Sequence, residues 1–553
     1  MSKNTYFRNS FSEDIFNQKY RHEGAETWPE LSRTVVEDVC QDYLTYNEKD
    51  QLTQYITDMK VLPGGRYLYY AGRPNKYYNN CYLLKAEEDT RQDWANLSWS
   101  AESCLMTGGG IGVDYSVYRP SGSPIARTGG TSSGPIPKMN MINEIGRRVM
   151  QGGSRRSAIY ASLNWKHGDI HDFLVAKDWQ SMPIAGTDKT LWDVKQEDFN
   201  FPAPLDMTNV SVNYDTEWLQ TYWRTGEPGE VFRKNVAQAL KTSEPGFSFN
   251  FFDKENETLR NACTEVVSSE SHDVCNLASI NFSRIAEIAE LQDVVHLTTK
   301  FLLCGTMRAD LPYQKVYETR EKNRRLGLGA MGLHEWLIAR GYLYEVTPEL
   351  HQWLSVWRGE SDKTADEFSR ELSVNRPAGV RAIAPTGTIG ILAGTSTGIE
   401  PIFATAYKRR YLVGGTEWRY QYVVDSAAEQ LIEQYGIEDP DSVESAMDLA
   451  QDPGRRVRFQ CDVQDYVDQA ISSTINLPAW GSELNNEDCV DDYVDLFARH
   501  AHRLRGLTVY ADGSRGGQPL TPVPYSEAKA HEGETFVETH DVCDITGGGT
   551  CGI

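Results

Sequence analysis

The sequence predicts an α/β protein, and three features of the chain lead to this prediction. Between about residues 150 and 515, short apolar runs that are typical of strands alternate with helical stretches, which is the pattern of an α/β architecture. Two segments before residue 150 carry apolar residues at helical spacing. The chain has 553 residues, which is long enough to bury a large core.

Residues 1–90 are expected to form a small helical region that ends soon after Leu62–Arg66, a turn signal with two glycines. Two amphipathic helices follow. Their apolar stripes are Trp94, Leu97, Ala101 and Leu105 in the first, and Met139, Ile142, Ile145 and Val149 in the second. The simplest interpretation is that both stripes face the core of the protein.

Residues 91–515 are expected to form the main α/β domain, in which the clearest strand-like runs are Arg381–Ala384, Ser473–Leu477 and Gly506–Tyr510. Residues 516–553 contain three prolines and a glycine triplet. This composition predicts a flexible C-terminal tail.

Composition excludes several classes of protein. The chain is 40% hydrophobic and 24% charged, it has no apolar run near the ~18 residues of a membrane span, and its N-terminus lacks the apolar core of a signal peptide. We therefore expect a cytoplasmic protein with no membrane partner. The net charge of −23 argues against nucleic acid as a partner, although helix N-termini and local arginines can still hold small nucleotides.

The ten cysteines are too sparse for a disulfide scaffold. No C-x-x-C pair occurs in the sequence, so we expect no metal bound by this chain. In a reducing compartment, cysteines at special positions are more often catalytic.

The most informative segment is Asn261–Glu265, which sets an amide, a thiol and a carboxylate at alternate positions. If the segment is extended, Asn261, Cys263 and Glu265 point to the same face. Cys275 follows twelve residues after Cys263, close enough to return to the same cavity. The pentapeptide alone is weak, because cysteine is often a small buried apolar residue.

Other motifs accompany this segment in a fixed order. They are Asn79–Leu84 upstream, Cys275–Asn281, Ala384–Ile389 with Gly394–Pro401 downstream, and the C-terminal segment Cys543–Ile553. In this order and spacing the set resembles the catalytic chain of ribonucleotide reductase, in a compact phage-type form, from about Leu62 to the C-terminus. The resemblance implies a ten-stranded α/β barrel of two five-stranded halves with a central finger loop. It also implies that no ATP-sensing domain precedes the barrel, since only 80 residues precede Cys81.

The resemblance implies a role for each catalytic residue. Cys263 would carry the thiyl radical that abstracts the 3′ hydrogen, Glu265 would accept the 3′-hydroxyl proton, and Asn261 would hold the substrate hydroxyls. Cys81 and Cys275 would form the dithiol that reduces the 2′ position, which requires their Cα atoms to come within about 7 Å. The expected reaction is reduction of ribonucleotides, with diphosphates as the expected substrate, to deoxyribonucleotides for DNA synthesis.

Two further regions resemble the substrate site of the family. Pro385, Thr386, Gly387, Thr388 and Ile389 resemble the loop that holds the substrate phosphate, where glycine lets the backbone approach and free amides bind oxygens. Asn80, Gly109 and Gly110 resemble the strip along which the substrate lies.

The resemblance also implies allosteric regulation by a deoxynucleoside triphosphate in a homodimer, with the two amphipathic helices meeting their copies. This alternative to core-facing stripes stays open at the level of sequence. The residues expected to bind the effector are Asp89, Arg119, Ile125, Arg127, Arg155, Arg156 and Ser157. The arginines suit stacking and phosphate contacts.

The radical source stays open between two branches of the family. One branch uses adenosylcobalamin, and the other imports the radical from a ferritin-like metal subunit through two adjacent tyrosines. This chain has Tyr510 at that place, with Val509 where the second tyrosine is expected. Tyr510 is therefore the one candidate for radical transfer.

The tail cysteines Cys543 and Cys551 flank glycines and suit thiol exchange with a thioredoxin-type reductant, although the family spaces its tail pair more closely. An alternative of another class is a nucleotide-binding thiol-relay protein without radical chemistry. That alternative would not need Asn261 and Glu265 beside Cys263. For a phage-encoded chain, the compartment would be the host cytoplasm.

Overall fold

The fold is described from a computed structural model of the whole chain. The structure describes residues 6–127, 129–149, 157–198, 201–413, 417–514 and 520–537. None of the described helices is both long and apolar enough to cross a membrane.

A mixed ten-stranded sheet forms the centre of the molecule, in the order β1-β9-β2-β3-β4-β5-β6-β14-β13, with β10 paired to β9. Its strands are β1 (Val61–Pro63), β2 (Cys81–Lys85), β3 (Gly110–Asp114), β4 (Ile159–Asn164), β5 (Thr208–Tyr214), β6 (Gly246–Phe249), β9 (Asp273–Asn281), β10 (Leu326–Met331), β13 (Thr474–Leu477) and β14 (Gly506–Ala511). Strands β2 to β6 run parallel, and β9 and β14 flank this run antiparallel to it.

The α/β class predicted from sequence is confirmed, and the sheet has ten strands. Between β10 and β13, the predicted strand Arg381–Ala384 forms isolated bridges, Leu328 with Arg381 and Ile383 with Ile471, in place of a continuous ladder. The ladders of the described residues therefore define a mixed sheet, and its closure into a barrel remains a proposal.

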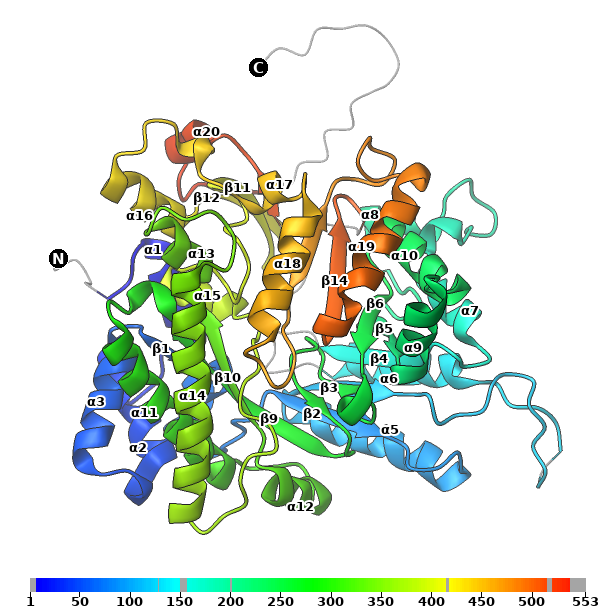
Figure 1. Cartoon of the computed structure of the whole chain (residues 1–553), viewed down its shortest axis with the longest axis horizontal. Helices are drawn as coiled ribbons and strands as arrows, with labels where there is room; N and C mark the ends of the chain where they lie inside the picture. The colour runs from blue at the N-terminus through cyan, green and yellow to red at the C-terminus, as the bar shows by residue number, and fades with distance from the viewer. Residues whose placement is uncertain are drawn as a thin grey trace, which may run out of the picture.

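Helices cover the outer faces of the sheet in two groups (Figure 1). Over β1, β9 and β10 lie α1 (Ser10–Lys19), α2 (Trp28–Cys40), α3 (Tyr46–Thr57), α4 (Gly65–Tyr70), α11 (Ile288–Arg308), α13 (Leu333–Ile338), α14 (Pro348–Glu371) and α15 (Gly387–Ala393). Over the remaining strands lie α5 (Arg91–Met106), α6 (Pro135–Arg148), α7 (Ile170–Leu174), α9 (Thr216–Thr225), α10 (Glu230–Thr242), α18 (Pro453–Gln464) and α19 (Val490–His500). Other helices are α8 (Leu191–Glu197), α12 (Gln314–Asn323), α16 (Ser426–Tyr435), α17 (Ala446–Leu449) and α20 (Tyr525–Ala530).

The N-terminal region holds the predicted helices and, in addition, two strands of the main sheet. The turn signal at Leu62–Arg66 is the end of β1 followed by the start of α4. Pro63 is tolerated in β1 because that strand pairs only with β9, at an edge of the sheet.

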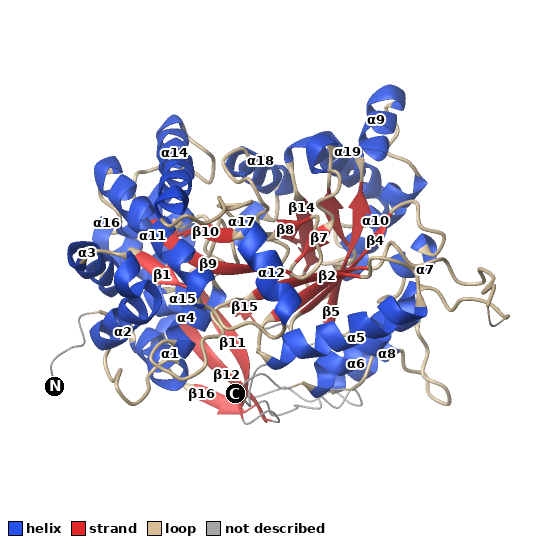
Figure 2. Ribbon diagram, turned by 90° about the horizontal axis from the view of Figure 1, so that it is seen from below, coloured by secondary structure: helices blue, strands red, loops and turns tan. Residues whose placement is uncertain are grey.

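The apolar stripes of α5 and α6 face the protein's own core. Leu97, Ala101 and Leu105 are fully buried in the same cluster as Met139 and Ile142, and the two helices lie side by side (Figure 2). The other stripe residues, Trp94, Ile145 and Val149, are partly buried against the same cluster. The stripes therefore pack on the core of the chain itself, and a dimer contact of these helices, which the resemblance implies, would have to use their other faces. Burial in the core already removes their apolar surface from water.

A second, antiparallel sheet was not predicted. It has the order β15-β11-β12-β16, with β11 (Ala406–Val413), β12 (Glu417–Val424), β15 (Leu520–Pro522) and β16 (Thr535–Val537), and Figure 2 shows it beside the main sheet. Residues 520–537, expected to be part of a flexible tail, instead pair with both edges of the β11–β12 hairpin. The unpaired edges of that hairpin explain the order, because they offer backbone partners to the chain that follows.

Candidate active site

A short hairpin carries the catalytic motif against the inner face of the sheet. Its strands are β7 (Leu259–Arg260) and β8 (Val267–Ser268). A Cβ at Gly112 would lie 1.6 Å from the Arg260 carbonyl oxygen, and one at Gly110 would lie 3.1 Å from Ala262. Glycines in β3 therefore let the hairpin backbone approach the strand closely, which is the physical need behind the predicted strip residue Gly110.

The tip of this hairpin is a turn, so the condition under which Asn261, Cys263 and Glu265 would share one face, an extended segment, is not met. The Thr264 amide donates to the Asn261 carbonyl at 3.0 Å, and Thr264 has φ 73°. Two strands of two residues each must reverse direction within six residues, which an extended chain cannot do. Asn261 and Glu265 are buried on either side of the turn, whereas Cys263 is exposed at its tip.

Cys81 and Cys275 face each other across two neighbouring strands. They are register partners in the antiparallel pair of β2 and β9, an arrangement that sets Cα atoms about 4.5–5.5 Å apart. Both are buried, and both are free thiols. The Asn261 amide donates to the Cys81 sulfur at 2.9 Å, so the hairpin and the cysteine pair form one site.

The electrostatics of the site follow from burial. Burial raises the pKa of both thiols well above the ordinary value, and the nearby Glu265 carboxyl adds to this effect. Burial also raises the pKa of Glu265 to about 7, partly offset by the Asn261 amide. At neutral pH, Cys81 and Cys275 are therefore protonated donors, and Glu265 is poised to exchange a proton.

The base of the hairpin is held by a residue that the sequence analysis missed. Arg260 is fully buried and donates to Asn250 Oδ1 at 2.6 Å and to the Arg505 carbonyl at 3.2 Å. A buried arginine needs such acceptors to offset its desolvation. An arginine directly before the motif was the available signal, but its type alone does not distinguish an anchor from a surface residue.

The predicted phosphate loop borders a cavity of about 640 Å³. Pro385, Gly387 and Glu400 line it. Thr386, which directly precedes α15, has φ 51°. Its hydroxyl oxygen accepts a hydrogen bond from the backbone amide of Gly398 at 2.8 Å. Among the predicted residues the walls also include Ser396 and Thr397 of the Gly394–Pro401 motif. The cavity residues Thr474 and Asn476 of β13 were not predicted.

The predicted strip residues lie at the start of β2 and β3. The backbone amide of Asn80 donates to the Cys275 carbonyl at 3.2 Å, and the backbone carbonyl of Asn80 accepts from the Gly110 amide at 2.9 Å. A Cβ at Gly109 would lie 2.4 Å from the Tyr82 ring, so a side chain there would displace a buried aromatic residue. Asn80 and Gly110 thus adjoin Cys275 and the hairpin.

Tyr510 lies on the inner face of β14. Leu507 and Val509 are buried in the outer core and Ala511 is also buried, whereas Thr508 and Tyr510 on the alternate face are only half-buried. Tyr510 is the register partner of Asn476, which lines the cavity.

The predicted effector residues form two groups at opposite ends of α6. At its N-terminal side, Asp89 pairs with Arg119, whose guanidinium also donates to the Pro124 carbonyl next to Ile125. At its C-terminal side, the Ser157 hydroxyl donates to the Val149 carbonyl at 2.8 Å. The fourteen residues of α6 separate the groups by about 21 Å, so one chain does not bring them together.

Of the remaining predicted effector residues, the structure describes Arg127, which belongs to neither group. Arg127 is exposed and no described contact joins it to these residues. Arg155, Arg156, Cys543 and Cys551 lie outside the described residues. Among the residues that the structure does describe, no group of three or more His, Cys, Asp or Glu side chains could hold a metal ion.

Comparison with known families decides the identity. The family model described as "Ribonucleotide reductase, barrel domain" matches residues 79–190, 214–351 and 375–510. This chain belongs to the ribonucleotide reductase family. It is a catalytic chain of that family, an oxidoreductase of deoxyribonucleotide synthesis that acts on ribonucleotides.

Relatives of this reductase fall in different branches of the family. It is 27% identical over 536 residues to the vitamin B12-dependent ribonucleoside-diphosphate reductase of Mycobacterium tuberculosis (85% of this chain, 73% of that protein). It is 24% identical over 690 residues to a putative adenosylcobalamin-dependent ribonucleoside-triphosphate reductase of Mycobacterium phage D29 (93% and 95%). The solved structure of the Actinobacillus ureae class Id ribonucleotide reductase alpha subunit shares its fold, with a TM-score of 0.70, 17% identity and coverage of 91% and 97%.

Proposed function

We propose that this reductase replaces the 2′-hydroxyl of a ribonucleotide with hydrogen at the site formed by Cys263, Asn261, Glu265, Cys81 and Cys275. The observation that carries the proposal is the register of β2 and β9, which sets Cys81 opposite Cys275 while Asn261 of the hairpin contacts Cys81. A thiol-relay protein without radical chemistry would need the cysteine pair. It would not need a buried carboxyl of raised pKa beside it.

The first step takes place at the tip of the hairpin. Cys263, as a thiyl radical, abstracts the 3′ hydrogen atom, and the sulfur becomes a thiol again. Glu265 accepts the proton of the 3′-hydroxyl, which requires its carboxylate form and hydrogen-bond reach. Asn261 holds the substrate hydroxyls from the other side of the turn.

The second step takes place at the cysteine pair. The leaving 2′-oxygen takes a proton from the dithiol and departs as water. Cys81 and Cys275 together give up two protons and two electrons, and end as a disulfide. Cys263 then returns its hydrogen atom to C3′ and Glu265 returns the proton to the 3′-oxygen, which restores the thiyl radical and the carboxylate. Their raised pKa values support this role, because a protonated thiol is the form that can donate the proton.

The substrate is held on both sides of the site. Pro385–Ile389 binds the phosphate at the cavity of about 640 Å³, and Asn80, Gly109 and Gly110 form the strip beneath the sugar. We take a ribonucleoside diphosphate as the substrate because the Mycobacterium tuberculosis relative is named as a diphosphate reductase. The phage relative, named as a triphosphate reductase, keeps the triphosphate as the alternative.

Regulation by a deoxynucleoside triphosphate would use a homodimer. The two groups of effector residues at opposite ends of α6 support this arrangement, because a second copy can set one group beside the other across a two-fold axis. The contact would use the outward faces of α5 and α6, where Trp99 and Met141 are exposed. In the tail, Cys543 and Cys551 would pass electrons from a thioredoxin-type reductant to the Cys81–Cys275 disulfide.

For the radical source we propose adenosylcobalamin over a ferritin-like metal subunit. Two relatives of the chain are named as B12-dependent or adenosylcobalamin-dependent. The position beside Tyr510 is Val509, which is buried in the outer core, so the chain lacks the second tyrosine of the other route. When bound, this cofactor supplies the radical that oxidises the Cys263 thiol.

The proposed function predicts conversion of labelled ribonucleotide to deoxyribonucleotide by the full chain with a small dithiol. We expect product with adenosylcobalamin present and none without it, measured separately for diphosphate and triphosphate substrates. Product only with an added metal subunit would overturn the proposed radical source. Disulfide exchange without deoxynucleotide under every condition would support the thiol-relay alternative instead.

A further inference from the structure

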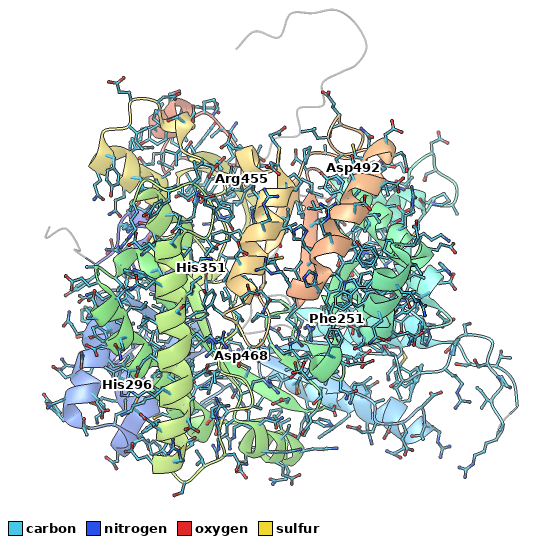
Figure 3. The ribbon with its side chains drawn as sticks, viewed as in Figure 1. Phe251, His296, His351, Arg455, Asp468 and Asp492 are labelled. Atoms are coloured by element: carbon cyan, nitrogen blue, oxygen red, sulfur yellow. The ribbon has the colours of Figure 1, made fainter. Side chains whose placement is uncertain are left out.

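A second pocket, apart from the cavity beside the phosphate loop, lies at the base of the catalytic hairpin. It has a volume of about 420 Å³, and Figure 3 labels two residues of its wall, Phe251 and Asp468. The wall combines the end of β6 and the chain after it, the end of α18 and the segment that follows, and the turn before β14, together with Arg358 of α14 and Arg381. The proposed catalytic roles use none of these lining residues.

Basic side chains outnumber acidic ones in the lining of this pocket, whereas acidic residues outnumber basic ones in the whole chain. Its wall carries five Lys or Arg residues against three Asp residues, whereas the chain as a whole has a net charge of −23. Positive charge gathered in one concave place on an acidic protein attracts small anions locally. The pocket is therefore a candidate anion site by its composition.

Three of the five cations pair with carboxylates, and two of these, Arg381 and Arg503, pair with two carboxylates each. Arg381 pairs with Asp362 at 2.8 Å and with Asp468 at 3.5 Å. Arg503 pairs with Asp462 and Asp465 at 2.8 and 2.6 Å. These pairs account for two of the aspartates of the wall, and the third, Asp253, is exposed.

The three cations other than Arg381 and Arg503 keep unused capacity. Among the described residues, Lys254 and Arg358 form no ion pair, and each donates only to a backbone carbonyl, that of Asp468 at 3.4 Å and that of Asp465 at 3.2 Å. Arg505 is 6% exposed and pairs through Nη2 with Glu257 at 2.8 Å. Its Nη1 is buried and has no hydrogen-bond partner among the described residues, an arrangement that costs free energy unless a ligand supplies an acceptor.

Repulsion between neighbouring cationic side chains also indicates that this place is electropositive. Burial is the largest cause that lowers the pKa of Lys254, and the charge of Arg505 is the second. The same two causes lower the pKa of Arg260, the hairpin anchor, to about 9. An anion in the pocket would relieve the repulsion among these cations.

The mouth of the pocket also offers an aromatic surface. Phe252 lines the pocket and is 51% exposed, and its ring lies 6.0 Å from that of the exposed Trp223. Trp223 in turn lies 6.2 Å from the His502 ring. Such rings can stack a nucleobase, which has a flat π face.

We propose that this pocket binds a polyphosphate group, either free or carried by a nucleotide, through Lys254, Arg358 and Arg505. Multiple phosphate oxygens match three donors with spare capacity. The site also contacts the hairpin directly, because Arg260 donates to the backbone carbonyl of Arg505. Both arginines also bond to Glu257, Arg260 to its backbone carbonyl and Arg505 to its carboxylate. Occupancy would thus be sensed at the base of the hairpin that carries Cys263. The inference goes beyond the proposed function and does not depend on it.

Calorimetric titration of the full chain tests this proposal, with inorganic tripolyphosphate in one arm and ATP in the other. The double substitution Lys254→Ala/Arg358→Ala should weaken one binding event by at least about tenfold, since two charge-assisted contacts are lost. Both side chains lie at the pocket surface, so the fold should be retained, which thermal unfolding checks. The matched control is Arg370→Ala, on the same helix α14 but 70% exposed, and it should bind like the wild type.

The arms also identify the form of the ligand. If ATP binds more tightly than tripolyphosphate and Phe252→Ala removes only that difference, the ligand is a nucleotide whose base stacks at the mouth. If tripolyphosphate binds as tightly as ATP and Phe252→Ala changes neither, the ligand is the polyphosphate alone. Equal affinity and stoichiometry in the wild type and the double variant, in both arms, would overturn the proposal.

Discussion

Replacing Cys263 with serine should abolish deoxynucleotide formation and leave the fold and nucleotide binding intact. Cys263 is exposed at the tip of the hairpin and contributes no buried packing, so its loss should not destabilise the protein. A serine O–H bond is stronger than a thiol S–H bond, and each ~4 kcal/mol added to a barrier slows the step about 10³-fold. We therefore expect a loss of more than about 10³-fold in turnover.

Steady-state conversion of labelled ribonucleotide measures this effect, and equilibrium binding of the substrate shows that the site persists. Cys489→Ser is the matched control, because Cys489 is a half-buried free thiol at the start of α19. The control should keep wild-type turnover. Multiple turnovers by the Cys263→Ser enzyme would remove the hairpin tip from the mechanism.

Replacing Glu265 with glutamine should lower turnover by about 10²–10⁴-fold, the range for removal of a general base. The substitution keeps the shape of the side chain, so packing around the buried residue is retained. Burial raises the pKa of Glu265 to about 7, and the carboxylate is the form that accepts a proton. Wild-type activity should therefore rise with pH through about 7 and level off above it.

The pH profile separates this role from a structural one. In Glu265→Gln, the residual activity should lose the rise near pH 7, whereas the exposed control Glu255→Gln should keep it. An unchanged rise in the Glu265→Gln enzyme would assign the titration to another group. The profile is read as kcat/KM, which reports groups of the free enzyme.

The local geometry of the proposed site differs from what the sequence indicated. Asn261 and Glu265 do meet at one place with Cys81 and Cys275, but a turn brings them there and a strand does not. Five residues are too few for their types to distinguish a short strand from a tight turn, and here the turn buries Asn261 and Glu265 but leaves Cys263 exposed at its tip. The positive φ of Thr264 carries no signal in residue type.

Other features depend on partners that are distant in the chain. The pairing of Cys81 with Cys275 joins strands 194 residues apart, and motif order alone indicated it. Nothing in Leu520–Pro522 or Thr535–Val537 distinguishes them from tail residues until the edges of the β11–β12 hairpin offer them backbone partners. The stripes of α5 and α6 are a different case. Their periodicity reveals an apolar face on each helix, but it does not show whether the chain's own core or a second subunit covers that face.

Mapping the disulfide after a single turnover tests the central claim most directly. The fully reduced Cys543→Ser/Cys551→Ser chain cannot pass the disulfide on to its tail. With radical source and substrate but no reductant it should form one deoxynucleotide and one disulfide, and mass spectrometry of the digested protein should find Cys81 linked to Cys275. The register of β2 and β9 predicts this link. Deoxynucleotide formed while Cys81 and Cys275 both remain free thiols would contradict the account.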